Sequence, residues 1–312
     1  MHKFLRTTIL IASVFTLLLF AVYEAKTYTP LSLDRKSQIE DKPNSCKENF
    51  IKFSKIDKAW KYTKGKGTKV AILDWLFDMS LEASNKYCNP TSLIPGESIG
   101  TGESWHGEWM AEIVHRIAPE AKIIPIRARS SRKTDKTSKS ERQAYEKYII
   151  KGIYFAADQG AVAVTNSMGP VKHSDDLRKA IDYAEEKGAV FINVHPEYII
   201  YSKDDYKEVD PDKLDKRIIH PGLVSVPKYP AKSEPGRDVY VWPYQIDPKY
   251  KEGWGYSNGP PIVAGVVALM KSVNPDLTCQ EIRSIIFESA FTWEGFKVLD
   301  AEVAVKESLK RK

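Results

Sequence analysis

This sequence has few cysteines and no strong excess of charge of either sign, and each shortage excludes a class of protein. Its 312 residues include only three cysteines, too few for a fold held together by several disulfides. No cysteines and histidines occur at the spacing of a zinc site. The net charge of +6 is modest, and no nucleic-acid-binding motif accompanies it. We therefore expect no nucleic-acid partner.

Apolar residues, in contrast, are plentiful enough for a core. They make up 42% of the chain, which excludes wholesale disorder. An α/β domain often reaches this length undivided. The cysteines allow two arrangements: Cys46 pairs with Cys88 and leaves Cys279 free, or all three thiols are unpaired and mostly buried.

One long apolar run lies near the N-terminus, from Ile9 to Val22, behind Lys3 and Arg6. A basic flank followed by such a run is typical of a secretory signal peptide, which we place at residues 1–25. The run is shorter than the roughly 20 apolar residues that span a bilayer. Tyr23 occupies a position where signal peptidase prefers a small residue, so an uncleaved membrane anchor is the alternative. Either way, we expect a secreted, periplasmic or cell-surface protein.

After a polar, proline-containing stretch at residues 26–50, which predicts a linker, strand and helix patterns alternate through residues 51–312. Short apolar runs predict strands at Lys69–Leu73, Lys122–Ile126, Ala161–Thr165, Ala189–Val194, Leu223–Val226 and Val239–Trp242. Helical spacing of apolar residues predicts helices at Trp109–Ile117, Ala144–Ala157, Ser174–Lys187, Pro261–Val273 and Cys279–Ser289. This alternation predicts a three-layer α/β fold, a mainly parallel sheet with helices on both faces. The charged segments Arg129–Arg142 and Ile200–Arg217 predict exposed loops, and a surface that faces substrate or membrane is the alternative for both.

Two side chains stand where a parallel sheet meets its ligands. Asp74 directly follows the strand that ends at Leu73, and ligands bind beyond the carboxyl ends of such strands. A carboxylate there can orient an imidazole, although the same position also suits a helix cap. His106 directly precedes a predicted helix, which leaves its ring accessible. A hydrogen-bonded structural histidine is the alternative, and four others compete for a chemical role: His115, His173, His195 and His220.

Ser257 is the third candidate, in the stretch Gly255-Tyr-Ser-Asn-Gly259. Pro260 and Pro261 open a helix behind it, as prolines can in a first turn. Nearby backbone N–H groups and the helix dipole point toward an oxyanion formed there. The alternative is a serine that only caps the helix. The stretch also matches the nucleophile elbow of α/β-hydrolases, but that family needs its aspartate and then its histidine after the serine. No histidine follows Ser257, which excludes that family.

The order aspartate, histidine, serine is one of the known orders of a catalytic triad. In this order, three blocks of the chain resemble the subtilisin-like serine peptidases. Residues 53–74 resemble the lead-in to the catalytic aspartate, and residues 106–111 with 117–123 resemble the histidine helix and the next strand. Gly255-Tyr-Ser-Asn-Gly-Pro-Pro-Ile-Val-Ala-Gly265 resembles the serine segment, and Asn274-Pro-Asp-Leu-Thr278 the loop after its helix. The resemblance covers nearly the whole chain from Phe53 onward.

The resemblance implies a serine endopeptidase that acts on peptide or protein substrates. Ser257 is then the nucleophile, His106 the general base and acid, and Asp74 the residue that orients the imidazole. It also implies that Ser167, Met168 and Gly169 form the strand edge that binds the substrate backbone. No cofactor is required. Members of the family often bind structural calcium, but no ligand set can be placed here; Asp78 and Glu82 are acidic residues near the site.

The departures from the family pattern concern the same site. The family has a small hydroxyl residue and glycine after its aspartate, where this chain has Trp75-Leu76. It has an oxyanion-binding asparagine where this chain has Glu197, close to His195. A protonated Glu197 or the ring of His195 can donate to an oxyanion, whereas an ionised carboxylate repels one. Loss of one such donor costs about 10²–10³ in rate, so we expect a weakened or pH-dependent enzyme.

A different function is the alternative. Trp75, Trp109 and Trp242 are bulky residues near the expected cleft and can fill it, which suggests an inactive pseudo-protease that binds peptides. The same tryptophans are equally compatible with simple core packing. A serine hydrolase that does not act on peptides is a third possibility.

Overall fold

A computed structural model describes residues 46–77, 82–100, 106–130, 139–196, 214–224, 237–244 and 255–311. Cys46–Lys312 forms one compact unit, and only this unit is described below. Residues 1–25, expected to be a signal peptide or an anchor, lie outside the described residues. Helix α2 (Cys46–Phe53) begins within the last residues assigned to the linker. No helix in the described part of the chain combines the length and the apolar composition needed to cross a bilayer.

A five-stranded sheet forms the centre of the unit, in the order β2-β3-β1-β4-β5. All its pairings are parallel. The strands are β1 (Lys69–Asp74), β2 (Thr91–Ser92), β3 (Lys122–Arg127), β4 (Ala163–Asn166) and β5 (Val190–Asn193). Their register places Leu73 beside Asn166, and Asn166 beside Asn193. Asp74, which follows Leu73, therefore lies at the carboxyl edge of the sheet.

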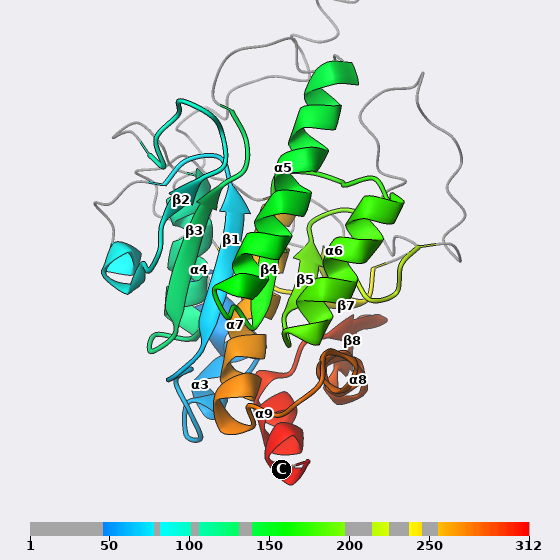
Figure 1. The fold of residues 1–312 in the computed structure, drawn as a ribbon. Coiled ribbons are helices and arrows are strands. Elements are labelled where there is room, and N and C mark those ends of the chain that lie inside the picture. Colours follow the sequence, from blue (N-terminus) through cyan, green and yellow to red (C-terminus); the bar gives the residue numbers. More distant parts are fainter. Residues whose placement is uncertain are drawn as a thin grey trace, which may run out of the picture. The chain divides into compact units, whose positions relative to one another are not determined.

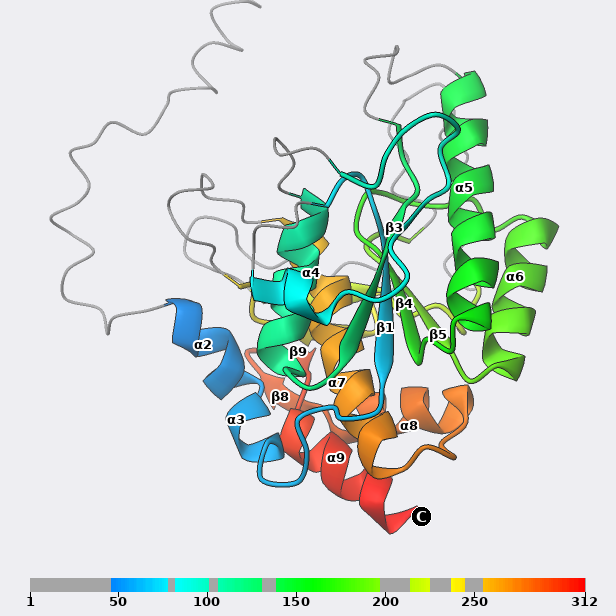
Figure 2. The same cartoon turned by 60° about the vertical axis from the view of Figure 1, so that its left-hand side comes forward.

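Helices cover both faces of this sheet, as Figures 1 and 2 show from two sides. One face carries α5 (Lys139–Asp158) and α6 (Asp175–Glu186), and the other carries α4 (His106–Ile117) and α7 (Gly259–Val273). Alternate side chains of β1 enter the two cores: Val70 and Ile72 pack on the α4 and α7 side, Ala71 and Leu73 on the other. Both faces of the strand are buried, which explains its unbroken apolar run. The predicted three-layer α/β fold is confirmed.

A second sheet extends the first, and the sequence did not predict its hairpin. Its order is β6-β7-β9-β8, and a parallel bridge between Ile192 and Ile219 links it to β5. The strands are β6 (Pro221–Leu223), β7 (Val239–Val241), β8 (Phe291–Trp293) and β9 (Phe296–Val298). The short helix α3 (Ile56–Ala59) and helices α8 (Cys279–Ser289) and α9 (Ala301–Lys310) complete the unit.

Helix α7 runs through the interior. Every residue from Gly259 to Lys271 is buried, as expected for a helix that is apolar on all sides. Gly265 allows it to approach α4 closely, because a Cβ at this position would lie 2.7 Å from Ile117 Cγ2. The two helices that follow His106 and Ser257 are therefore packed directly against each other.

Two expectations from the sequence are corrected. The loop predicted at Arg129–Arg142 ends earlier, because α5 begins at Lys139. Its first turn contains lysine, glutamate and arginine, good helix formers that also suit a loop, so their charge misled the prediction. The strand predicted at Leu223–Val226 lies at Pro221–Leu223 instead. Cys88 and Cys279 both carry free thiols, which corresponds to the arrangement without a Cys46–Cys88 disulfide.

Candidate active site

Asp74 ends β1 in a fully buried position. Its Oδ1 accepts a hydrogen bond from the Trp75 N–H (2.7 Å) and lies 2.7 Å from His106 Nδ1. Oδ2 is buried without a hydrogen-bond partner among the described residues. Oδ1 therefore makes the contacts that orient an imidazole, and Oδ2 makes none among the described residues. Trp75 stands where the family that the sequence resembles has a hydroxyl side chain.

His106 is the first residue of α4, and Gly107 fixes where that helix begins. The Gly107 N–H donates to the Leu76 carbonyl (3.0 Å), in the segment just beyond β1. A Cβ on Gly107 would lie only 2.2 Å from the same oxygen. Only glycine permits this approach. The contact joins the start of α4 to the end of β1 and brings the imidazole to Asp74.

Ser257 lies in a 3-10 turn, η5 (Tyr256–Asn258), that runs directly into α7. Its Oγ is 3.3 Å from His106 Nε2 and 3.0 Å from the Ser167 carbonyl oxygen, to which it donates. Ser167 Oγ in turn donates to the Ser257 carbonyl (2.8 Å). The structure thus brings Asp74, His106 and Ser257 into one continuous chain of polar contacts.

The environment of His106 shifts its protonation. Burial disfavours the imidazolium, but the charge of Asp74 and the hydrogen bond to it favour that form more strongly, so the pKa of His106 lies above its usual 6.5. Glu108, which is 1% exposed, also raises this pKa. A histidine with a raised pKa accepts a proton readily, as a general base must.

The edge at Ser167, Met168 and Gly169 is held by a residue that the sequence analysis missed. Asn166 is fully buried, and its amide donates to Asn193 Oδ1 (2.6 Å) and to the Gly169 carbonyl (3.0 Å). Its Oδ1 accepts from the Met168 N–H (3.2 Å). The sequence did offer a signal for Asn166, because it is an asparagine at the end of a buried strand, directly before the candidate binding residues.

Of the two oxyanion candidates, only His195 lies among the described residues. Glu197 lies outside the described residues. His195 follows β5, and its ring lies 5.3 Å from that of Tyr256, centroid to centroid, beside Ser257 in the sequence. Arg237 Nη2 is 3.0 Å from His195 Nδ1. The sequence analysis did not single out Arg237, because nothing in its local sequence marks it.

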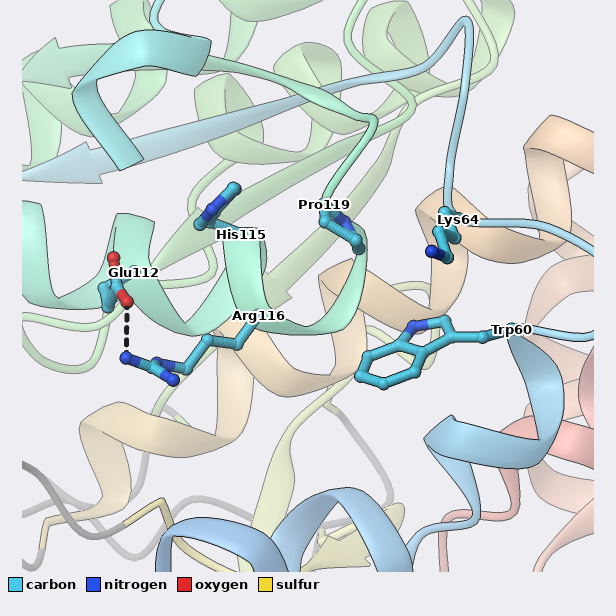
Figure 3. Close-up of a pocket in the computed structure, with 6 residues that line it drawn as sticks. All are labelled: Trp60, Lys64, Glu112, His115, Arg116 and Pro119. Carbon is cyan, nitrogen blue, oxygen red and sulfur yellow. Dashed lines mark ion pairs between the residues drawn. The ribbon is translucent and has the colours of Figure 1, made fainter. Parts of the chain in front are cut away.

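The other histidines of the described chain are not part of the contacts that join Asp74, His106 and Ser257. His173 and His220 stack on each other with centroids 6.2 Å apart, and His220 Nδ1 donates to the Asn193 carbonyl (3.1 Å). His115 lies in the second half of α4 and lines a cleft of about 220 Å³ (Figure 3). The lining residues of this cleft are Trp60, Lys64, Glu112, His115, Arg116 and Pro119. None belongs to the candidate active site, and Arg116 is paired with Glu112 (2.9 Å).

The tryptophans proposed to fill the cleft are mostly packing residues. Trp109 is 7% exposed and belongs to the core between α4 and α7. Trp242 packs against Phe53 and Trp293 in the second sheet, with ring centroids 4.8 and 6.0 Å away. Trp75 is half-buried, with the Arg129 guanidinium 5.3 Å from its ring.

A metal site cannot be built from the side chains that the structure describes, because no three histidine, cysteine, aspartate or glutamate residues cluster there. Asp78 and the side chain of Glu82, the acidic residues noted for calcium, lie outside the described part.

Known proteins with similar sequences or folds point to one family. No family model matches the chain. Thermitase from Thermoactinomyces vulgaris is 26% identical over 233 residues, which cover 69% of this chain and 78% of that protein. Subtilisin DY from Bacillus licheniformis is 25% identical over 239 residues, 73% of this chain and 85% of the relative.

Among solved structures, the MycP3 protease from the type VII (ESX-3) secretion system has a similar fold. Its TM-score is 0.65 at 18% identity, and the match covers 84% of this chain and 90% of that one. The sequence matches and the shared fold agree with the three blocks of sequence and with the parallel sheet that carries them. The chain is therefore similar to the subtilisin-like serine peptidases in sequence and in fold, at an identity low enough to mark it as divergent from them.

Proposed function

We propose that this chain is an exported serine endopeptidase that hydrolyses peptide bonds with Asp74, His106 and Ser257. The observation that carries the proposal is the unbroken series of contacts from Asp74 Oδ1 through both ring nitrogens of His106 to Ser257 Oγ, at 2.7 and 3.3 Å. These atoms are within or near the reach needed for proton transfer, and such contacts tighten when substrate binds.

The chemistry follows from which atoms hold protons. Ser257 Oγ attacks the scissile carbonyl carbon while its proton passes to His106 Nε2, which gives a tetrahedral intermediate. His106 then donates this proton to the leaving amine, and the C–N bond breaks. Water repeats the two steps on the acyl-enzyme, releasing the acid and restoring Ser257. Throughout, the Nδ1–H of His106 donates to Asp74, whose charge stabilises the imidazolium.

In this proposal, one set of groups next to Ser257 binds the substrate backbone and another binds the oxyanion. An extended peptide can add to the edge at Ser167–Gly169, which Asn166 supports from within the sheet. The oxyanion falls near the Ser257 N–H, just before the 15-residue helix α7, whose dipole favours negative charge. The next N–H groups do not contribute, because Asn258 and Gly259 donate to backbone carbonyls and two prolines follow. The ring of His195 is the side-chain donor on this side.

Fluorophosphonate labelling and peptide hydrolysis test the catalytic proposal. The wild-type chain should be labelled and should cleave peptides at some pH between about 5 and 9, and Ser257→Ala should lose both activities. Ser289→Ala, a half-buried serine in α8, is the matched control and should behave as wild type. An unlabelled wild type, alongside a serine protease that reacts, would refute the proposal.

Export rests on the apolar run from Ile9 to Val22 behind two basic residues. Cell fractionation should find the protein outside the cytoplasm, and N-terminal sequencing should show whether residues 1–25 are removed. A cytoplasmic, uncleaved product would overturn this part alone. The pseudo-protease alternative is not favoured, because Trp109 and Trp242 pack into the cores.

A further inference from the structure

Arg237 joins three segments next to the nucleophile. Its guanidinium donates to the carbonyls of Val194 and Pro221, at the end of β5 and the start of β6. It also lies 4.6 Å from the ring centroid of Tyr256, the residue before Ser257. Arg237 Nη2 also lies 3.0 Å from His195 Nδ1.

This last contact fixes where His195 carries its proton. A guanidinium stays protonated in proteins and has only donors. His195 Nδ1 must therefore accept the hydrogen bond, which leaves it without a proton. A neutral imidazole has one N–H, so that hydrogen is on Nε2.

The surroundings keep this ring uncharged. Burial, followed by the charge of Arg237, lowers the pKa of His195 to about 4. Burial also lowers the pKa of the neighbouring His220 to about 3, so that ring is neutral as well. The carboxyl of Asp238, next to Arg237, has its pKa raised by burial to about 6. The phenol ring of Tyr256 packs beside the His195 ring.

We propose that Arg237 is a positioning residue that holds His195 as the neutral Nε2–H tautomer, so that this N–H donates to the oxyanion formed when Ser257 attacks. The proposal rests on the proposed function of Ser257. It gives this chain a side-chain donor where its relatives use an asparagine. A neutral donor suits the site, because an imidazolium at His195 would repel the positive charge that His106 acquires during attack.

The tautomer can be measured without any activity. The full chain, labelled with ¹⁵N in its six histidine rings, is compared by NMR with His195→Gln, which identifies the His195 signals. We expect Nε2 protonated and Nδ1 bare at pH 7, with no titration above about pH 5. In Arg237→Leu the midpoint should rise, because the charge of Arg237 is gone, but it should stay below the ordinary value of about 6.5, because burial is the larger cause of the lowered pKa. A proton on Nδ1, or an imidazolium at pH 7, would overturn the proposal.

Kinetics test what the ring does. His195→Leu should lower kcat about 10²–10³-fold with little change in KM, since it removes a donor to the transition state. His195→Gln retains a donor and should recover most of the rate. Arg237→Leu should lower kcat at least about tenfold, and Arg237→Lys, which still donates, should recover part of it.

The double variant separates positioning from a merely structural role. Arg237→Leu combined with His195→Leu should have nearly the kcat of His195→Leu alone, because the positioning role of Arg237 is exerted through that ring. The hydrogen bonds of Arg237 to the Val194 and Pro221 carbonyls should affect stability instead, which urea unfolding measures separately. Additive losses, or full activity in His195→Leu, would overturn the proposal while Ser257 keeps its role. If wild type shows no Ser257-dependent turnover, both the proposed function and the oxyanion role fail, and NMR still decides the tautomer.

Discussion

Gly107→Ala is the substitution that tests most directly how the fold positions His106. The new Cβ would lie 2.2 Å from the Leu76 carbonyl oxygen, whereas ordinary van der Waals contact begins at 3.4 Å. The start of α4 must therefore move by about 1.2 Å relative to the segment after β1. A displacement of about 1 Å at a reacting group lowers the rate about 10²-fold, and overpacking of this kind costs about 1–3 kcal/mol in stability.

The assay is kcat/KM for a peptide substrate, together with urea unfolding of the same preparations. Gly152→Ala in α5 is the matched control: its Cβ would approach Leu73 Cδ2 to 2.6 Å, but that methyl ends a flexible side chain that can shift. We expect the control to retain its kcat/KM within about twofold. The better helix propensity of alanine should offset part of any loss in its free energy of unfolding. Wild-type rate and unfolding free energy in Gly107→Ala would refute the idea that this contact positions His106.

Substitutions at three further residues have defined outcomes. Asp74→Asn should lower kcat about 10⁴-fold. Activity requires neutral His106 and rises with pH through its pKa, which Asp74 holds up; the variant's acid limb should therefore move to lower pH in a pH–rate profile. Asn166→Ala removes the donor to Asn193 Oδ1, one of two donors to the Gly169 carbonyl and the acceptor of the Met168 N–H. It should cost about 2–4 kcal/mol in urea unfolding and raise KM. The Asp300 carboxylate caps α9 by accepting from the Val303 N–H, and it pairs with Lys55. Asp300→Ala removes both interactions and should lower the free energy of unfolding by about 2 kcal/mol, whereas Asp300→Asn should retain most of the cap.

Each of these expectations can fail in its own way. An unchanged acid limb in Asp74→Asn would mean that Asp74 does not set the protonation of His106. Unaltered stability of Asn166→Ala would show that other groups form hydrogen bonds with the atoms that Asn166 no longer contacts. If Asp300→Asn is as unstable as Asp300→Ala, the charge and not the cap stabilises this end of α9.

The sequence predicted four of the five strands of the central sheet, because β1, β3, β4 and β5 are buried on both faces, and it missed β2, whose two residues are only half-buried. Runs such as Lys69–Leu73 are apolar without interruption, and the helices between them have clear periodicity. The placement of Asp74 after such a strand followed from the same pattern. The hairpin of β8 and β9 was missed because its strands are three residues each, half-exposed and too short to show a period.

The parts of the site that were missed depend on contacts between distant segments. Arg237 and His195 are 42 residues apart, and nothing near either residue indicates that they meet. Trp242 was placed near the cleft by its distance in sequence from Ser257, whereas its ring packs with Phe53 at the other end of the unit's sequence. Local patterns report burial and periodicity, but they do not report which loops come together.

The burial of α7 also governs when the molecule acquires its chemistry. A helix that is apolar on every side has no stable exposed form in water, so it takes its place only once β4, α4 and α9 surround it. Ser257 at its start meets His106, 151 residues earlier in the chain, and contacts between such distant segments close late in folding. A partly folded copy therefore offers peptide segments to cut but holds no assembled nucleophile. If the proposed function holds, each molecule is therefore a potential substrate until this late contact forms.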